Sequence, residues 1–463
     1  MENNEKVMGL KDVILLNIVS VFGVAFFTSA AKMGPSQVIL WILAALLFFI
    51  PEGLVVAELS TTWPVEGGLG AWCTEAFGKK TGFLISWIYF INNVIYFPAL
   101  LMSTSVFFAY GLNNPNLSDN KIYICIFSIV FIWLLTFANM KGFNISKKIN
   151  NFSSVFAFAI TGLLVGLALY WIFGLKQPVQ THYTLGSMIP KFSDLNSLVF
   201  FSTMIFALAG LELPPSLIGK IRNPEKNFPK AILVASIVLP VLFILGTTSL
   251  TIVMKPDKIG LTTGMINAIE VVCNAGNIHW FVIIVAFATL MFRVGSINAW
   301  LLSPIVMFIE NSKNILPKWF TKIDKENNTP KNALIFQAIF ISLLTLMAYS
   351  MPTAESAYWL IAAMGTILYF IPFMAMFAAL IKLRKKYPDK KRRYKVPGGF
   401  TVPIIGFLVV VIGAFLTCLP PTGVNVGEIL KYEFKLIGGA VVFIAIGYIF
   451  YAIYQRNKNT EVK

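Results

Sequence analysis

The chain has 463 residues, of which 57% are hydrophobic and only 13% are charged, and its mean hydropathy is +0.75. An ordinary soluble domain is about one quarter charged, so this composition excludes a water-soluble globule and, with it, most enzyme folds. The formal net charge of +16 indicates orientation in a membrane, since Lys and Arg gather in the cytoplasmic loops of membrane proteins, and we expect no nucleic-acid partner.

Apolar stretches of spanning length recur along the whole chain, and at about 20 residues per helix they predict twelve transmembrane helices. Their approximate ranges are 12–33, 36–58, 82–112, 122–140, 152–174, 196–219, 230–254, 278–309, 333–350, 356–381, 402–420 and 436–454. Alternate loops then carry 28 Lys and Arg on the side of both termini and 8 on the other side, with Arg293 inside a span. We therefore expect both termini in the cytoplasm.

Cysteine and histidine are sparse, with four and two residues in the whole chain. No spacing typical of a zinc site or of a redox pair is present, and two histidines leave little room for a hydrolytic triad. We expect no catalytic residue, no metal and no cofactor.

The first span contains Gly23 near its middle, beside Ser20, and a small and polar stretch follows at residues 28–31. A helix break inside a bilayer is tolerated only where it lines a cavity, because freed backbone groups need partners. Half-helix ends at such a break can hold a substrate's charged groups. The alternative is that Gly23 is a point of close helix packing, and the sequence leaves both interpretations open.

The sixth span carries AGLE at residues 209–212, followed by two prolines at 214–215 that prevent a regular helix from continuing. Glu212 is therefore a carboxylate beside a helix break, either functional or a structural acceptor that ties the break together. The two interrupted spans lie five helices apart, which is the spacing of an inverted repeat. We expect one transporter domain over residues 1–463, with repeats at about 12–175 and 190–385 and two additional helices at about 400–455.

Other polar residues interrupt apolar spans. Arg293 in the eighth span is either a substrate or gating ligand or half of a structural ion pair. Asn92, Asn93 and Tyr96 interrupt the third span, where they line a pathway or form interhelical hydrogen bonds. The carboxylates at positions 52 and 58, near the end of the second span, are expected to reach the cytoplasmic interface.

Several short motifs recur in an order that is specific to one group of transporters. They are FIPEGLVVAEL at 49–59, EGGLGAW at 66–72, GLE with IRNPEKNFPKA at 210–212 and 221–231, NSKNILP at 311–317, YKVPGG at 394–399 and FLTCLPP at 415–421. With these motifs the chain resembles the amino acid/polyamine/organocation superfamily and, within it, the bacterial glutamate/GABA antiporter family. The resemblance covers nearly the whole chain.

The resemblance implies an all-α, LeuT-like membrane fold and alternating access, with an amino acid held between the broken first and sixth helices. The Gly-Ser-Gly break of relatives falls on residues 21–23, the aromatic gate on Phe206, a coupling carboxylate on Glu212 and a substrate-facing tryptophan on Trp300. Phe26, Phe27 and Arg293 change the polarity of the expected pocket. The expected substrate-binding residues are Val21, Phe22, Gly23, Phe26, Asn93, Phe206, Ala207, Gly210, Ser296 and Trp300, with Glu212 and Arg293 in coupling or gating.

We therefore expect an amino-acid antiporter of the inner membrane that exchanges extracellular glutamate for intracellular GABA. Alternatives are an exchanger of another amino acid for its decarboxylated amine, such as tyrosine for tyramine, and a proton-coupled importer of neutral amino acids. A receptor or channel is disfavoured, because the sequence has broken helices without rings of charge or a filter motif, and no enzymatic activity is expected. The expected partners are small-molecule amino acids and the lipid bilayer, and the chain is either a monomer or a homodimer.

Overall fold

The computed structural model describes residues 7–65, 67–190, 195–261, 263–324, 326–349, 354–419 and 426–461. Glu66, Pro420 and Pro421, which belong to two of the motifs above, lie outside these residues. Within the described ranges the chain is helical, and its β-structure is limited to two isolated bridges. The observed secondary structure agrees with the all-α membrane fold expected from the sequence.

The first half of the chain begins with a broken helix and continues through long apolar helices. Its elements are α1 (Leu10–Val21), α2 (Ala25–Ala31), η1 (Gly34–Ser36), α3 (Gln37–Ala44), the π-helical turn η2 (Ala45–Phe49), α4 (Ile50–Thr62), α5 (Gly68–Phe77), α6 (Lys79–Gly111), η3 (Pro115–Asp119), α7 (Lys121–Met140), α8 (Phe143–Leu169) and the π-helical turn η4 (Tyr170–Gly174).

The second half of the chain begins with a short helix, and it also contains an interrupted segment. Its elements are α9 (Leu185–Met188), α10 (Leu195–Ala207), η5 (Pro214–Lys220), α11 (Pro224–Val253), η6 (Pro256–Lys258), α12 (Gly264–Ala275), α13 (Trp280–Ser312), α14 (Lys318–Thr321), α15 (Lys331–Tyr349), α16 (Ala354–Lys386), α17 (Thr401–Thr417) and α18 (Val426–Glu461).

Among the described residues, eight helices are long and apolar enough to cross a membrane, and the α1–α2 pair, bent by 53°, makes a ninth. Shorter apolar helices occupy α10, α15 and α17. Each of the twelve predicted segments thus contains an apolar helix, and the chain is an integral membrane protein. The number of twelve crossings and the inverted repeat stay predictions.

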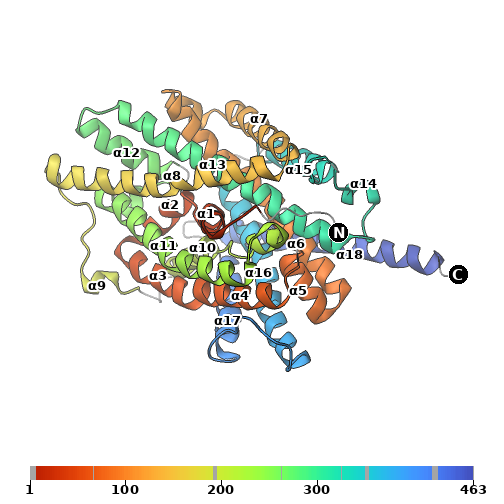
Figure 1. Ribbon diagram of the computed structural model, residues 1–463. Helices are drawn as coiled ribbons and strands as arrows, with labels where there is room; N and C mark the ends of the chain where they lie inside the picture. Colours follow the sequence, from red (N-terminus) through yellow and green to blue (C-terminus); the bar gives the residue numbers. More distant parts are fainter. Residues whose placement is uncertain are drawn as a thin grey trace.

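The surface of the bundle is apolar where lipid would surround it. On α7, five large apolar side chains recur at helical spacing and are all more than half exposed, namely Ile122, Ile126, Val130, Leu134 and Phe137. α17 and α18 both pack on α16, and α18 projects beyond the bundle at its C-terminal end (Figure 1). Continuous apolar stripes of this kind are costly in water and are favoured against lipid chains.

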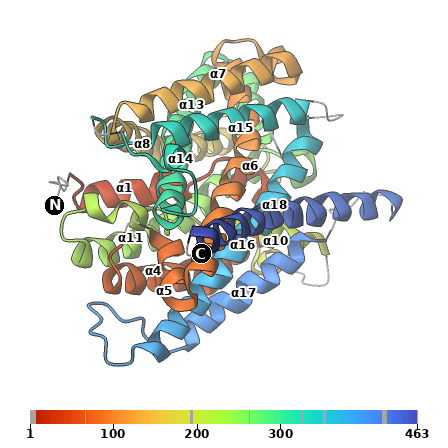
Figure 2. The same cartoon turned by 90° about the vertical axis from the view of Figure 1, so that its right-hand side faces the viewer.

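The interior is built on α6 and α13, which pack against each other, and α13 also packs against α8. α1 lies inside the bundle, with the other helices around it (Figures 1 and 2). Just before α1, the backbone of Met8 forms a β-bridge with Ile221 at the end of η5. The Met8 N–H donates to Lys220 O at 3.0 Å, and the Arg222 N–H donates to Met8 O at 2.9 Å. The two interrupted segments are therefore joined at one end.

Candidate functional site

The first helix is interrupted at residues 22–24. α1 ends at Val21, Phe22 is extended with ψ of 124°, and α2 restarts at Ala25. Glycine is required at the centre of this break, because a Cβ on Gly23 would lie 2.6 Å from the ring of Phe26. The sequence-based prediction of an interruption around Gly23 is confirmed by this geometry.

The second interruption follows α10. Its backbone turns at Gly210, whose φ of +138° lies in the region that favours glycine, and a Cβ there would come within 3.1 Å of Ser20 O. Pro214 and Pro215 then start η5, where their missing N–H groups leave no helical donor unpaired. Gly210 therefore allows the second break to lie directly against the end of α1.

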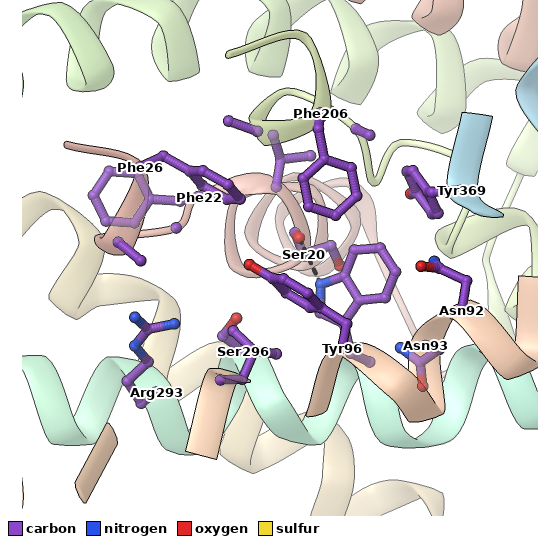
Figure 3. A pocket seen from close by; sticks show the side chains of 17 residues that line it. Ser20, Phe22, Phe26, Asn92, Asn93, Tyr96, Phe206, Arg293, Ser296 and Tyr369 are labelled. Atoms are coloured by element: carbon purple, nitrogen blue, oxygen red, sulfur yellow. Dashed lines mark hydrogen bonds between the residues drawn. The ribbon is translucent and has the colours of Figure 1, made fainter. Parts of the chain in front are cut away.

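A pocket lies between the two breaks. It is lined by Ser20, Val21, Phe22, Gly23, Ala25, Phe26, Asn92, Asn93, Tyr96, Leu100, Phe206, Ala207, Ala209, Arg293, Ser296, Trp300 and Tyr369 (Figure 3). Nine of the ten residues expected to bind substrate are therefore brought together, along with Arg293. Gly210 and Glu212 lie next to this lining and not in it, and the role of all twelve in transport stays a prediction.

Aromatic side chains form one wall of the pocket. Phe206 packs edge-on against the rings of Phe26, Tyr96 and Tyr369, with centroids 5.9, 5.4 and 5.3 Å away. Phe26, Tyr96 and Phe206 also line a second cavity, which continues toward the first turns of α10 at Val199. These three rings thus separate the pocket from that cavity.

Polar groups are found toward both ends of the pocket. Arg293 on α13 is 1% exposed, and its guanidinium donates to Ser103 Oγ at 2.8 Å. Arg293 and Ser296 lie toward one end, whereas Asn92 and Tyr369 lie toward the other (Figure 3). The pocket is therefore polarised, with a cation at one end and neutral amide and phenol groups at the opposite end.

Glu212 lies behind the pocket in a network of hydrogen bonds. Its Oε1 accepts from Tyr89 Oη at 2.5 Å and from the hydroxyl of Tyr369, and its Oε2 accepts from Gly210 N at 3.0 Å. Glu212 thus accepts hydrogen bonds from the backbone of the break and from two other helices, and its role stays a prediction. Tyr369 connects it to the pocket, since that ring also lines the cavity.

Sequence reasoning missed Tyr89 and Tyr369, and it misplaced Glu52. Tyrosines in spans are usually interfacial anchors, so only their position opposite a buried carboxylate could have identified these two.

Glu52 was expected at the cytoplasmic interface, yet it is 0% exposed and faces Glu212 and the backbone of Gly210 and Leu211. The prediction is wrong because α4 continues to Thr62, almost three turns beyond Glu52, so this residue lies well inside the span.

Glu58, expected at the same interface, is also fully buried and does not reach water. It forms ion pairs with Arg384, whose Nε donates at 2.9 Å, and with Arg392 at 3.1 Å. Val396 N–H donates to the same carboxylate at 2.6 Å. Glu58 therefore joins α4 to the end of α16 and to the basic loop that follows.

Among the described residues, no group of three or more His, Cys, Asp and Glu side chains lies close enough together to hold a metal ion. The polar groups that converge on the pocket are therefore amides, hydroxyls and one guanidinium. Such a set suits an organic ion with charges at both ends.

Comparison with known proteins identifies related chains over nearly the full length. A family model described as amino acid permease matches residues 8–446. An uncharacterized transporter of Legionella pneumophila is 29% identical, with 97% of each chain covered. A probable agmatine/putrescine antiporter of Lactococcus lactis is 27% identical over 96% of this chain and 95% of its own. A glutamate/gamma-aminobutyrate antiporter of the same species is 24% identical over 99% of this chain and 93% of its own. These names indicate transporters and not enzymes.

Proposed function

Because the chain belongs to the amino acid permease family, we propose that it is an amino-acid antiporter that exchanges extracellular glutamate for intracellular GABA by alternating access. The named relatives support antiport of amino acids or amines. We propose the inner membrane as its location and cytoplasmic termini, on the basis of the Lys and Arg distribution. Twelve spans with two inverted repeats complete the proposal.

The observation that carries the choice of substrate is the buried guanidinium of Arg293 in the pocket wall. Decarboxylation of glutamate removes its α-carboxylate and leaves GABA, so both molecules keep one carboxylate distant from the nitrogen. Arg293 can bind that shared carboxylate in both halves of the exchange, and charge-assisted hydrogen bonds to carboxylates are among the stronger polar contacts.

The opposite end of the pocket suits the ammonium group that glutamate and GABA also share. Asn92 Oδ1 is buried and has no hydrogen-bond partner among the described residues, so it can accept from an ammonium. Tyramine, agmatine and putrescine carry no carboxylate that Arg293 could bind. An exchanger of these amines is therefore the weaker candidate for this pocket.

The test is exchange by the purified protein in liposomes. Liposomes loaded with unlabelled GABA should take up labelled glutamate, and uptake should be greater at acidic than at neutral external pH. Equal uptake into empty liposomes, or uptake that depends on a sodium gradient, would contradict antiport.

Arg293→Gln tests the substrate assignment. Loss of a hydrogen bond to a charged group costs about 1.5–3 kcal/mol, so the apparent affinity for both glutamate and GABA should fall by about 10- to 100-fold. Arg393→Gln is the matched control, because that arginine is 62% exposed and pairs with Glu225 at 3.2 Å, far from the pocket lining. If Arg293→Gln affects neither substrate, the guanidinium does not bind their carboxylate.

A second candidate is a proton-coupled importer of neutral amino acids, which the buried carboxylate of Glu212 favours. An importer would accumulate a labelled neutral amino acid in empty liposomes under an inward proton gradient. Glu212→Gln should then abolish accumulation and leave counterflow largely intact. Antiport predicts no accumulation in empty liposomes with either protein.

A further inference from the structure

Two carboxyl groups from different elements meet behind the pocket. Glu52 projects from α4 and Glu212 from the segment after α10, and both are 0% exposed. The approach is enforced by the neighbouring residue, because a Cβ on Gly53 would lie 3.0 Å from Leu211 Cδ1 and 2.6 Å from Ile232 Cγ2. A larger residue at position 53 would therefore require the side chains of Ile232 and Leu211 to shift.

The two carboxyl groups have different surroundings. Glu212 has the environment of an anion, since two phenol hydroxyls and one backbone amide donate to its oxygens. Neither carboxylate oxygen of Glu52 has a hydrogen-bond partner among the described residues. A buried carboxylate without donors or a cation is highly unfavourable, and a second anion beside it raises that cost.

No cation neutralises the pair in the part of the chain that the structure describes. The ion pairs there engage other carboxylates, and on α4 itself Glu58 is held by Arg384 and Arg392. The titratable groups that face the pair are Tyr89 on α6 and Tyr369 on α16. α17, which packs on α4, carries no charged residue, and α11 has its charges in its first two turns, at Glu225, Lys226 and Lys230.

We propose that Glu52 and Glu212 form one proton-binding site, in which the proton is held on Glu52 and Glu212 is the hydrogen-bonded anion. The ligand is a proton from water, which adds to a Glu52 carboxylate oxygen, and no other bond changes. The carboxylic acid so formed can donate to Glu212, the nearest anion. The coupling of this proton to transport rests on the exchange activity proposed above.

The site is connected to the pocket through Gly210. The Gly210 amide donates to Glu212, while the Gly210 Cα lies against Ser20 and Val21, two residues that line the pocket. Any opening of the pocket that separates the two breaks therefore moves Ser20 and Val21 away from the Gly210 backbone beside the pair and admits water there. Proton release and substrate release then occur in the same conformational change.

Infrared spectroscopy tests the site without transport. At pH 7 ordinary carboxyl groups are ionised, so the C=O stretching band of a protonated carboxyl group in the wild-type protein in liposomes reports a perturbed site. Glu52→Gln should remove that band, whereas Glu212→Gln and the exposed control Glu326→Gln should keep it. Absence of the band in the wild type, or its survival in Glu52→Gln, would overturn the proposal. If Glu52→Gln does not fold, Glu52→Asp should shift the frequency of the band, and an unshifted band would overturn the proposal.

Exchange at equal pH on both sides tests the coupling. Labelled GABA against unlabelled GABA should show a rate that changes by up to about tenfold per pH unit, the limit for one proton, and Glu52→Gln should flatten this profile. A profile of unchanged slope in Glu52→Gln would overturn the coupling. Absence of exchange in the wild type would instead refute the proposed substrate, and the infrared result would still decide whether the pair holds a proton.

Discussion

Glu52 and Glu58 lie six residues apart on the same helix, and both side chains are completely buried. Glu58 is surrounded by two arginine side chains and a backbone amide. Glu52 faces another carboxyl group, and among the described residues its oxygens have neither a cation nor a hydrogen-bond partner. One helix thus carries two carboxylates of similar burial in opposite electrostatic surroundings.

The contrast separates two regions with different tasks. The Glu58 cluster joins α4, α16 and the basic loop, and breaking it would leave uncompensated charge in the interior. The Glu52–Glu212 pair lies where two helix breaks meet, and one of its hydrogen-bond donors, Tyr369, also lines the pocket. The first region is suited to holding the helices together and the second to changing with the state of the pocket.

The largest effect is expected from Glu58→Gln. This variant removes the counter-charge from two buried arginines, and loss of one partner of a buried pair costs about 3–5 kcal/mol. The thermal unfolding temperature of the detergent-purified protein should fall clearly. Glu225→Gln is the control, because its exposed pair with Arg393 contributes at most about 1 kcal/mol. Equal shifts in both variants would remove the distinction drawn for Glu58.

The next effect is expected from Tyr369→Phe, which keeps the ring and removes one of the two phenol donors of Glu212. A hydrogen bond to a charged group contributes about 1.5–3 kcal/mol, so unfolding should occur at a lower temperature and exchange should slow. Tyr387→Phe is a matched control, since Tyr387 donates to Glu75, a carboxylate that is 40% exposed. If the control is equally destabilised, the burial of Glu212 does not strengthen its hydrogen bonds.

Much of this arrangement could be predicted from residues that break the pattern of an apolar span. Glycine and proline marked both interruptions, and Arg293 was identified because a guanidinium in a span needs a polar partner. These signals are local, so the sequence alone showed them. Some of the expected substrate-binding residues, such as Asn93 and Ser296, were polar interruptions of this kind, and others, such as Phe206 and Trp300, were implied by the family resemblance. Nine of the ten line the observed pocket.

The missed features depend on which helix faces which. Nothing near Tyr369 in the sequence shows that its hydroxyl meets Glu212, 157 positions earlier in the chain. Glu52 was misplaced because the length of an apolar stretch predicts a span without fixing where the span ends. An error of one helical turn in that end moves a side chain from water into the bundle. Long-range packing decides both cases, and a single sequence does not contain it.

A smaller effect is expected from Trp300→Phe, which keeps an aromatic ring in the pocket and removes the bond from Trp300 Nε1 to Ser20 O at 2.8 Å. A neutral hydrogen bond contributes about 1 kcal/mol, which corresponds to about a fivefold loss of apparent affinity for labelled glutamate. Trp87→Phe is the control, because it removes an equivalent bond to Phe443 O at 2.8 Å outside the pocket. An equal loss of affinity in the control would show that the effect is not local to the site.

The smallest effect is expected from Asp324→Asn. This variant tests whether the pH dependence of exchange arises from the buried Glu52–Glu212 pair or from carboxylates on the surface. The hydrogen bond with Lys331, at 2.9 Å, and the amide of Asn327 lower the pKa of Asp324 below its ordinary value. A group of this kind stabilises the fold above its ordinary pKa of about 3.9, and the contribution is lost only as the pH falls through the lowered value. Asp324 is therefore charged throughout the range from pH 8 to pH 5.

The exchange profile of Asp324→Asn over that range should run parallel to the wild-type profile, while Glu52→Gln flattens it. A profile that flattens in Asp324→Asn as well would place the proton-sensitive step in the surface loops. The two carboxylates of α4 would then differ in their contacts but not in their roles, since neither would respond to pH during transport.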